Sequence, residues 1–457
     1  MSTHASHYWN TPLFWITTIS GFLLITTTLL VLGISPLIAL VLCTGLISIV
    51  LLFHSPLLLL SLLFIVRMSL DYSSQYLSVS FFNVNLSLSQ LVGLGIAFLG
   101  GIFLFLHGRP LLRFPLLFPF ALVGLWGVFT LTYSINPTAT LSELLRFFNL
   151  FIIGALAYVS VKRYRDFRTL LQAIFISSIL PILFGLYQFA MGIGLQDENV
   201  SIPRIFGTFS HPNVYSLFLF ALIALGTLYF LIYAKSTAGK LLLSSYLVLV
   251  TLTLILTYAR IAWIALFVFL GLLAFSRLKS LLIPLILFPF LLIALSPSIQ
   301  ERVSEAFHPT PDSSITWRKN LWHDMSLKTK IEEREWLGSG MDTFRTSSEA
   351  LRGLRFGSND PHNDFVKFYV EGGRVGVAVL SLYILSFLWF VTRIYFKTPS
   401  HSLRHLAAIT GFVFFALLLA SLSDNVFKNT PVQWVLWPLM GGLLALYRES
   451  TKKSLGE

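Results

Sequence analysis

The sequence predicts an all-α polytopic membrane protein with about 12–14 transmembrane helices and one long loop on the non-cytoplasmic face. Of its 457 residues, 56% are apolar and only 11% are charged, which excludes a soluble enzyme held by a single anchor. Apolar segments of bilayer-spanning length recur along the chain, and only the region 297–373 has the composition of a soluble protein. Basic residues gather in alternate loops, as in proteins that cross the membrane many times.

Fourteen apolar segments are candidates for membrane spans. They are 13–32, 35–53, 56–70, 88–106, 114–132, 143–161, 169–190, 213–234, 241–258, 260–276, 280–296, 374–396, 404–421 and 430–447. The turn that divides the region 35–70 is marked by His54-Ser55-Pro56. Twelve or thirteen spans are the alternative count. We divide the chain into N-terminal transmembrane helices, 1–140, and a transmembrane core, 141–457, which includes the long loop.

The orientation follows from lysine and arginine, which favour cytoplasmic loops. With fourteen spans, the basic loops all fall on one side, and the opposite short loops are nearly free of basic residues. The basic set is Arg109, Arg113, Lys162, Arg163, Arg165, Arg168, Lys235, Lys240, Arg277, Lys279, Arg393, Lys397, Arg404, Arg448, Lys452 and Lys453. Both termini are therefore predicted to be cytoplasmic.

The net charge of +12 does not indicate a nucleic-acid partner, because the basic residues are scattered over short loops between spans. We expect the lipid bilayer to be the partner of this surface, and no nucleic acid.

Arg260 is the most informative single residue. It lies in the run from Leu241 to Ser276, which holds no other charge and is about twice as long as one span needs. The run therefore predicts two spans with almost no loop between them and a guanidinium at the hinge. Such a residue usually faces a polar cavity and holds a negative group. The alternative is an arginine that extends to the lipid headgroups.

The long segment 297–373 is expected to be functional, since structureless loops of this length are rare in compact folds. Within it, Thr316–Met325 predicts an amphipathic helix with Trp317, Leu321 and Met325 along one side. The alternative is a helix that lies on the membrane surface, held by Trp317 and Trp322.

The sequence contains no motif of a familiar cofactor or metal enzyme. It has no glycine-rich phosphate loop, no HExxH, GxSxG or CxxC motif, and no Asp-x-Asp metal site. We therefore predict no cofactor and no metal.

Two arginines and a histidine are further candidates on the non-cytoplasmic face. Arg204 precedes the eighth span, and Arg146 lies one turn into the sixth, three residues after Glu143. The alternative for Arg146 is an ion pair with Glu143 at the start of a helix. His362 follows Pro361, a residue suited to the start of a helix, which places the imidazole at the mouth of the twelfth span. The alternative for His362 is a capping or interfacial residue.

Taken in order, these residues resemble the O-antigen ligase and O-antigen polymerase superfamily over roughly residues 140–445. The motifs that carry the resemblance are Arg204…Gly207-Thr208-Phe209…Pro212-Asn213, Tyr258-Ala259-Arg260, Trp317-Arg318…Trp322, Leu337-Gly338-Ser339-Gly340-Met341-Asp342-Thr343-Phe344, and His362-Asn363-Asp364-Phe365…Glu371-Gly372-Gly373…Gly376. The ligases are usually described with twelve spans, so the count of about fourteen departs from the family in the first 70–110 residues.

The resemblance implies a metal-independent, inverting membrane glycosyltransferase of the bacterial inner membrane. Its donor would be a glycan on undecaprenyl pyrophosphate, and its acceptor lipid A-core or another glycan. The long loop 297–373 and the active site would then be periplasmic.

The resemblance also suggests roles for single residues. Arg260, Arg204 and Arg146 are expected to bind the pyrophosphate, because guanidinium groups bind phosphate in a bidentate manner. His362 is expected to act as general base on the acceptor hydroxyl, or only to orient that hydroxyl. Asn363 and Arg318 are expected as secondary substrate-binding residues.

Three other functions compete with ligation. A polymerase of the same superfamily would add the glycan to a second lipid-linked unit, but such enzymes are often described with two large periplasmic loops. A polytopic transporter would show internal repeats and a charged path through the membrane. A structural membrane protein would not need Arg260 in a hinge. We expect ligation to lipid A-core.

Overall fold

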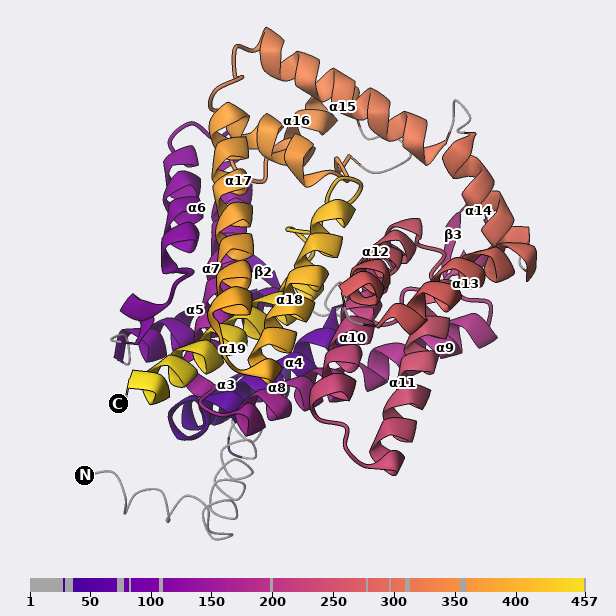
Figure 1. Cartoon of the computed structure of the whole chain (residues 1–457). Coiled ribbons are helices and arrows are strands. Elements are labelled where there is room, and N and C mark those ends of the chain that lie inside the picture. The colour runs from indigo at the N-terminus through magenta and orange to yellow at the C-terminus, as the bar shows by residue number, and fades with distance from the viewer. Residues whose placement is uncertain are drawn as a thin grey trace.

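The structure is a computed structural model that describes residues 28, 36–71, 78–81, 84–106, 110–197, 200–276, 278–295, 297–308, 313–353 and 359–455. It is a bundle of helices with two short antiparallel hairpins, β1 with β2 and β3 with β4 (Figure 1). The predicted span 13–32 lies outside the described residues except for position 28, and so do Arg109 and Arg277 of the basic loops.

The elements follow the chain in this order. The first part contains α3 (Pro36–His54), α4 (Pro56–Leu70), β1 (Ser78–Phe81), β2 (Val84–Ser87), α5 (Leu88–Leu106), the 3-10 helix η2 (Leu111–Arg113), α6 (Leu117–Thr130) and α7 (Pro137–Ser160). The middle contains α8 (Tyr164–Ser177), α9 (Ile179–Ala190), β3 (Leu195–Asp197), β4 (Val200–Arg204), α10 (Pro212–Ile232), α11 (Thr237–Leu256) and α12 (Arg260–Ser276). The last part contains η3 (Lys279–Leu281), α13 (Leu282–Leu295), α14 (Pro297–Phe307), α15 (Ser314–Ile331), α16 (Phe344–Arg352), α17 (Asp364–Lys397), α18 (His401–Ala420) and α19 (Thr430–Leu455).

The predicted class, an all-α polytopic membrane protein, is confirmed. Among the described residues, seven helices are long and apolar enough to cross a membrane, and four shorter helices are also apolar. Large apolar side chains lie on the outer surface of these helices, for example Phe98 and Phe105, which are 68% and 88% exposed. Such a surface suits lipid and not water. The number of crossings stays a prediction.

Two predicted breaks between spans are confirmed. α3 ends at His54 and α4 begins at Pro56, and Ser55 caps α4 by accepting a hydrogen bond from the Leu58 amide. Proline at the first position of a helix loses no hydrogen bond, which is why the chain can turn there. α11 ends at Leu256 and α12 begins at Arg260, so the hinge is three residues long.

Two predicted spans lie within longer helical segments that are each long and apolar enough to cross a membrane, Tyr164–Ala190 and Asp364–Lys397. The first contains the span 169–190 and is divided at Ser178, where α8 ends and α9 follows. The span 374–396 belongs to α17, which begins ten residues earlier at Asp364 and contains a non-helical residue, Gly373. Apolar periodicity marks the buried length of a helix and does not register a polar first turn or a kink.

The segment 297–373 is largely helical and packs on the bundle. α15 extends the predicted amphipathic helix, and its Leu321 and Met325 are buried with Phe344 of α16 and Val370 of α17. Trp317 packs against this cluster, and the Trp322 indole donates to the Pro361 carbonyl at 2.6 Å. The amphipathic face therefore contacts protein, which corrects the alternative of a helix held at the membrane surface by these tryptophans.

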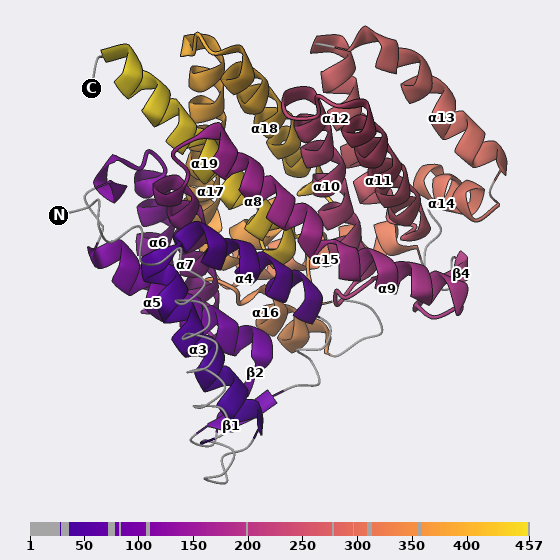
Figure 2. The same ribbon diagram turned by 90° about the horizontal axis from the view of Figure 1, so that it is seen from below.

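One continuous core joins both parts of the chain. Buried apolar residues from α3 to α19 form a single cluster, in which α7 packs along α19. α15 and α16 cover one end of the bundle (Figure 1). α4 and α8 lie side by side at the opposite end (Figure 2). This arrangement brings together the first half of α15, the residues just before α17 and the α18–α19 loop.

A labelling experiment tests the predicted orientation. Ser236 caps the start of α11, one helix length from the hinge, and Ser314 opens α15. In a background without the single native cysteine, Cys43, we expect a cysteine at 314 to react with an impermeant maleimide in whole spheroplasts. A cysteine at 236 should react only after the membrane is opened. Labelling of 236 in intact spheroplasts would reverse the orientation.

Candidate active site

Arg260 is the first residue of α12 and forms an ion pair across the hinge. Its Nη1 lies 2.9 Å from Oε2 of Glu305 in α14. The chain makes a tight turn just before Arg260. Tyr258 in this turn has a positive φ of 50°, and its side chain packs against Ile299 of α14. The sequence predicts a negative group beside Arg260. Within the protein this group is the carboxylate of Glu305, in the long segment.

Arg204 is bound to the same hinge. Its Nε donates to the Thr257 carbonyl at 3.0 Å, and its Nη2 donates to Asn213 Oδ1 at 3.0 Å. The side chain is buried, with 8% of the residue exposed. Because a cation at a helix C-terminus satisfies carbonyls that have no helical partner, Arg204 also stabilises the end of α11. The structure therefore brings Arg204 and Arg260 to one three-residue turn.

His362 is oriented by Asp424, a residue of the α18–α19 loop. His362 Nδ1 and Asp424 Oδ1 are 3.2 Å apart. Burial acts to raise the pKa of Asp424, but the His362 hydrogen bond and the charges of His362 and Arg318 outweigh it and lower the pKa to about 2. The carboxylate can then only accept, so the proton between the two side chains lies on Nδ1, and in the neutral tautomer of the ring this leaves the lone pair on Nε2.

Arg318 and Trp317 of α15 border this histidine. Arg318 Nη1 donates to the Ser423 carbonyl at 3.0 Å, whereas its Nε is buried and has no hydrogen-bond partner among the described residues. Burial lowers the pKa of Arg318, while the charge of Asp424 acts to raise it. The Trp317 ring stands edge-on to the imidazole, with the centroids 6.5 Å apart. One guanidinium nitrogen at this site is thus available for a substrate oxygen.

His211, the N-cap of α10, is a site residue that the sequence did not single out. Its Nδ1 accepts from the Asn213 amide at 3.1 Å. Burial and the charge of Arg204 lower its pKa to about 4, and the charges of Asp424, His362 and Arg318 also act on it. Charges of the arginine hinge and of the His362–Asp424 pair therefore both act on His211. At neutral pH His211 is an uncharged donor.

Asn363 has a structural position. Its Oδ1 accepts from the Phe365 and Val366 amides, and its Nδ2 donates to the Leu422 carbonyl. Asn363 is therefore the N-cap of α17, and the helix begins at Asp364 instead of at Pro361. Both ends of the amide hold the loop that carries His362, which has a positive φ of 47°.

Arg146 belongs to a second polar cluster. It forms a two-point ion pair with Glu143, and its Nη2 donates to the Phe427 carbonyl at 3.2 Å. The alternative prediction of an ion pair at the start of the sixth span is confirmed. Nothing in the described contacts joins Arg146 to Arg204 or Arg260.

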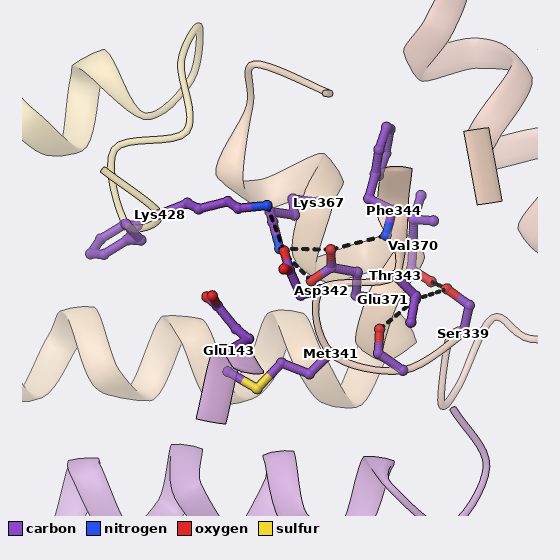
Figure 3. A network of polar contacts seen from close by, with 12 residues as sticks. Glu143, Ser339, Met341, Asp342, Thr343, Phe344, Lys367, Val370, Glu371 and Lys428 are labelled. Atoms are coloured by element: carbon purple, nitrogen blue, oxygen red, sulfur yellow. Dashed lines mark hydrogen bonds and ion pairs between the residues drawn. The ribbon is translucent and has the colours of Figure 1, made fainter. Parts of the chain in front are cut away.

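A buried network lies beside Glu143, the ion-pair partner of Arg146 (Figure 3). Lys367 of α17 contacts Glu371 at 2.6 Å and Asp342 at 3.1 Å, and Lys428 contacts Asp342 at 2.7 Å. Burial acts to raise the pKa of Asp342, yet the two ammonium groups lower it to about 2. The network ties three segments together, namely the turn at 338–342, α17 and the α18–α19 loop.

The kink of α17 explains how the turn 338–342 enters the helix. The Arg374 and Val375 amides donate to the Glu335 and Trp336 carbonyls, while the Val370 and Glu371 carbonyls accept from the Ser339 and Gly340 amides. The broken helix thus keeps its backbone hydrogen bonds by exchanging them with the segment 335–340. A Cβ at Gly373 (φ 59°) would lie 2.3 Å from the Trp336 carbonyl carbon, so only glycine fits.

Replacement of Lys367 by methionine should destabilise the protein. Side-chain exposure is 5% for Lys367 and 2% for Glu371, so the change leaves a buried carboxylate with one fewer cation. We expect a loss on the order of 3–5 kcal/mol, seen as a lower melting temperature in detergent. Lys319→Met, at an exposed position of α15, is the matched control and should melt like the wild type.

Three site residues were found only in the structure. Glu305 and Asp424 are partners of Arg260 and His362, and His211 shares their field. Among the described residues, no group of three or more histidine, cysteine, aspartate or glutamate side chains is arranged to hold a metal ion.

Comparison with known proteins gives one family match. Residues 245–381 match the family model described as O-antigen ligase, and this stretch contains Arg260, Arg318 and His362. A search of curated proteins finds no match. The resemblance seen in the motifs is confirmed over residues 245–381, where the chain is similar to the O-antigen ligase-like superfamily, and this match supports a membrane enzyme of the O-antigen ligase or polymerase type.

Proposed function

We propose that the protein transfers a glycan from undecaprenyl pyrophosphate to a hydroxyl of lipid A-core, on the periplasmic side of the inner membrane. Two observations carry the proposal: two arginines meet at one hinge, and a carboxylate orients His362. Charges of both groups act on His211. Lipid pyrophosphate is a good leaving group. The reaction therefore needs fixed positive charge and a base for the incoming hydroxyl more than a strong acid.

Arg260 and Arg204 bind the pyrophosphate in this proposal. Glu305 and the Thr257 carbonyl hold the two guanidinium groups in place before the substrate arrives. The donor, which carries more negative charge than one carboxylate, then recruits Arg260. As the bond from the anomeric carbon to the pyrophosphate oxygen breaks, its electron pair moves to that oxygen, and the arginines stabilise the developing charge.

His362 receives the proton of the acceptor hydroxyl at Nε2. The hydroxyl oxygen attacks the anomeric carbon on the face opposite the pyrophosphate, so the configuration inverts. Asp424 stabilises the imidazolium that forms, because its carboxylate already accepts from Nδ1. Arg318 Nε, which has no described partner, is placed to bind an oxygen of the acceptor or donor sugar. No metal takes part in these steps.

The choice of ligation over polymerisation rests on the single long segment. α14, α15 and α16 all lie between 297 and 353, and the other connections predicted on that face are short. A single long segment beside the site suits an enzyme that transfers a completed glycan to a different kind of acceptor.

Reconstitution tests this proposal. Purified protein in proteoliposomes receives undecaprenyl-pyrophosphate glycan with and without lipid A-core. We expect one joined product with lipid A-core, no lengthening of the donor without it, and undecaprenyl pyrophosphate released in equal amount. Longer lipid-linked glycan in the absence of lipid A-core would show a polymerase instead.

A further inference from the structure

A cavity with several charged residues in its lining lies apart from the arginine hinge. Its volume is about 440 Å³, and it is formed by the end of α4, the first turns of α5, the first half of α7 and the start of α19. The residues that matter for its chemistry are Arg67, Gln90, Arg146, Asn149, Lys428 and Trp434.

The lining of the cavity contains three basic residues that do not belong to the arginine hinge. Apart from the segment 297–373 and Arg374, which follows it directly, the face predicted to be periplasmic has five basic residues, and Arg204 and Arg260 belong to the hinge. The other three, Arg67, Arg146 and Lys428, all line this cavity. Because that face has few basic residues in its short loops, their convergence favours recognition of an anion.

Two residues of the lining each have a buried polar atom without a hydrogen-bond partner in the part of the chain that the structure describes. Arg146 Nη1 and Asn149 Oδ1 are buried and form no hydrogen bond with the described residues. An unpaired guanidinium nitrogen costs free energy unless a ligand or water completes it. A donor and an acceptor of this kind, both lining one cavity, suit a ligand that carries phosphate oxygens and hydroxyl groups.

The two acidic residues of the lining support the same ligand chemistry. Glu143 and Asp342 line the cavity together with the three cations. A site for a bare phosphate would gain nothing from carboxylates, whereas sugar hydroxyls donate to them readily. The lining therefore fits a sugar that is joined to a phosphate.

An apolar surface continues from the cavity along α5 and α7. Leu94 and Leu145 line the cavity and are 41% and 37% exposed. One helical turn further on, Phe98 of α5 and Phe148 of α7 are 68% and 43% exposed. The two helices pack against each other, so these side chains form a path that a lipid chain can follow from the cavity into the bilayer.

The cavity is connected to His362 through the α18–α19 loop. Asp424 of this loop contacts His362, and Lys428 of the same loop lines the cavity. Between them, the Phe427 amide donates to Asp364 Oδ2 and the Phe427 carbonyl accepts from Arg146. A ligand in the cavity thus lies against the segment that orients the base.

We propose that this cavity binds the phosphate-bearing sugar headgroup of the lipid-anchored acceptor, with its lipid chain along α5 and α7. The inference rests on the proposed function and assigns Arg146 to the acceptor instead of the donor pyrophosphate. Two lipids share this chemistry, namely phosphorylated lipid A-core and a second undecaprenyl-pyrophosphate glycan, and the test below separates them.

Photo-crosslinking measures whether a lipid occupies the cavity, and it does not require glycan transfer. Ala97 lines the cavity, whereas Gly95, two residues earlier in α5, is exposed and a Cβ there meets no atom within 4 Å. Benzoylphenylalanine at 97 should label phosphorylated lipid A-core at least tenfold more than its dephosphorylated form, and Arg67→Gln with Lys428→Gln should remove the labelling. The probe at 95 should label both forms alike. Equal labelling of the two forms from position 97 would overturn the proposal.

The same probe distinguishes the two sources. Preference for undecaprenyl-pyrophosphate glycan over lipid A-core at position 97 would identify the cavity as the acceptor site of a polymerase. Phosphate-dependent labelling by a protein that transfers no glycan to either lipid would refute the proposed function and leave the lipid site in place.

Kinetics test the acceptor role. With the donor saturating, the double variant Arg67→Gln, Lys428→Gln should raise the KM for the acceptor at least tenfold and leave the KM for the donor within twofold. Gly93→Leu, which fills the cavity where a Cβ lies 3.1 Å from Asn149 Nδ2, should do the same, and Gly95→Leu should not. A raised KM for the donor alone would show that the cavity holds the donor.

Discussion

Replacing Arg260 with alanine should reduce glycan transfer by 10²–10³-fold or more, while the protein stays folded and inserted. The change removes the guanidinium of the first residue of α12, and with it the charge proposed to stabilise the leaving pyrophosphate. Arg260→Lys keeps a cation for Glu305 but lacks the fork that binds two phosphate oxygens, so we expect weak activity from it as well. The measurement is the initial rate of transfer in membranes with matched protein levels.

The control for the Arg260→Ala variant uses Glu305, the ion-pair partner of Arg260. Arg260→Ala leaves Glu305 without this ion pair, and the loss of activity must be separated from that effect. The double variant Arg260→Ala, Glu305→Gln removes both charges and should melt closer to the wild type while remaining inactive. Recovery of transfer in the double variant, or near-normal transfer in Arg260→Ala, would show that Arg260 has no role with the pyrophosphate.

Replacing His362 should cost on the order of 10²-fold or more in kcat if the imidazole is the general base. Asparagine is the better substitution here, because His362 has a φ of 47° and asparagine tolerates this conformation better than alanine does. Asp424→Asn should give a smaller loss, since the imidazole remains but loses the carboxylate that fixes its tautomer.

The alternative role for His362 predicts a different pattern. A residue that only orients the acceptor would raise the KM for the acceptor and leave kcat close to the wild-type value. Full activity of His362→Asn with both substrates saturating would remove the base from the mechanism. Lys319→Met, at an exposed position of α15, serves again as the unchanged reference.

Local chemistry explains which parts of the fold the sequence predicts well. The break at Ser55 and Pro56 and the short hinge before Arg260 follow from the capping serine, the proline and the lone charge in an apolar run. The amphipathic helix follows from the spacing of Trp317, Leu321 and Met325, which the structure buries or half-buries. In each case the signal lies within one or two helical turns.

The partners of the site residues depend on long-range contacts that no local pattern contains. Asp424 and Glu305 are 62 and 45 residues from His362 and Arg260 in the chain. In sequence each is one of several scattered acids. The Gly373 kink is similar, because its hydrogen bonds go to the segment 335–340 and not to a neighbouring turn. For Arg146, the ion pair with Glu143 follows from their spacing of three residues in the sequence. Its separation from the arginine hinge depends on the tertiary structure and does not follow from that spacing.

The most direct test of the central claim is a single-turnover reaction of the purified protein in excess EDTA. Undecaprenyl-pyrophosphate glycan and lipid A-core are mixed with enzyme in excess over donor, and released undecaprenyl pyrophosphate and joined glycan are measured together. We predict equal amounts of both, with an inverted anomeric bond, and a rate that EDTA leaves unchanged and Arg260→Ala abolishes. A strict need for Mg²⁺ or Mn²⁺, or joined glycan with a retained anomeric bond, would contradict the account.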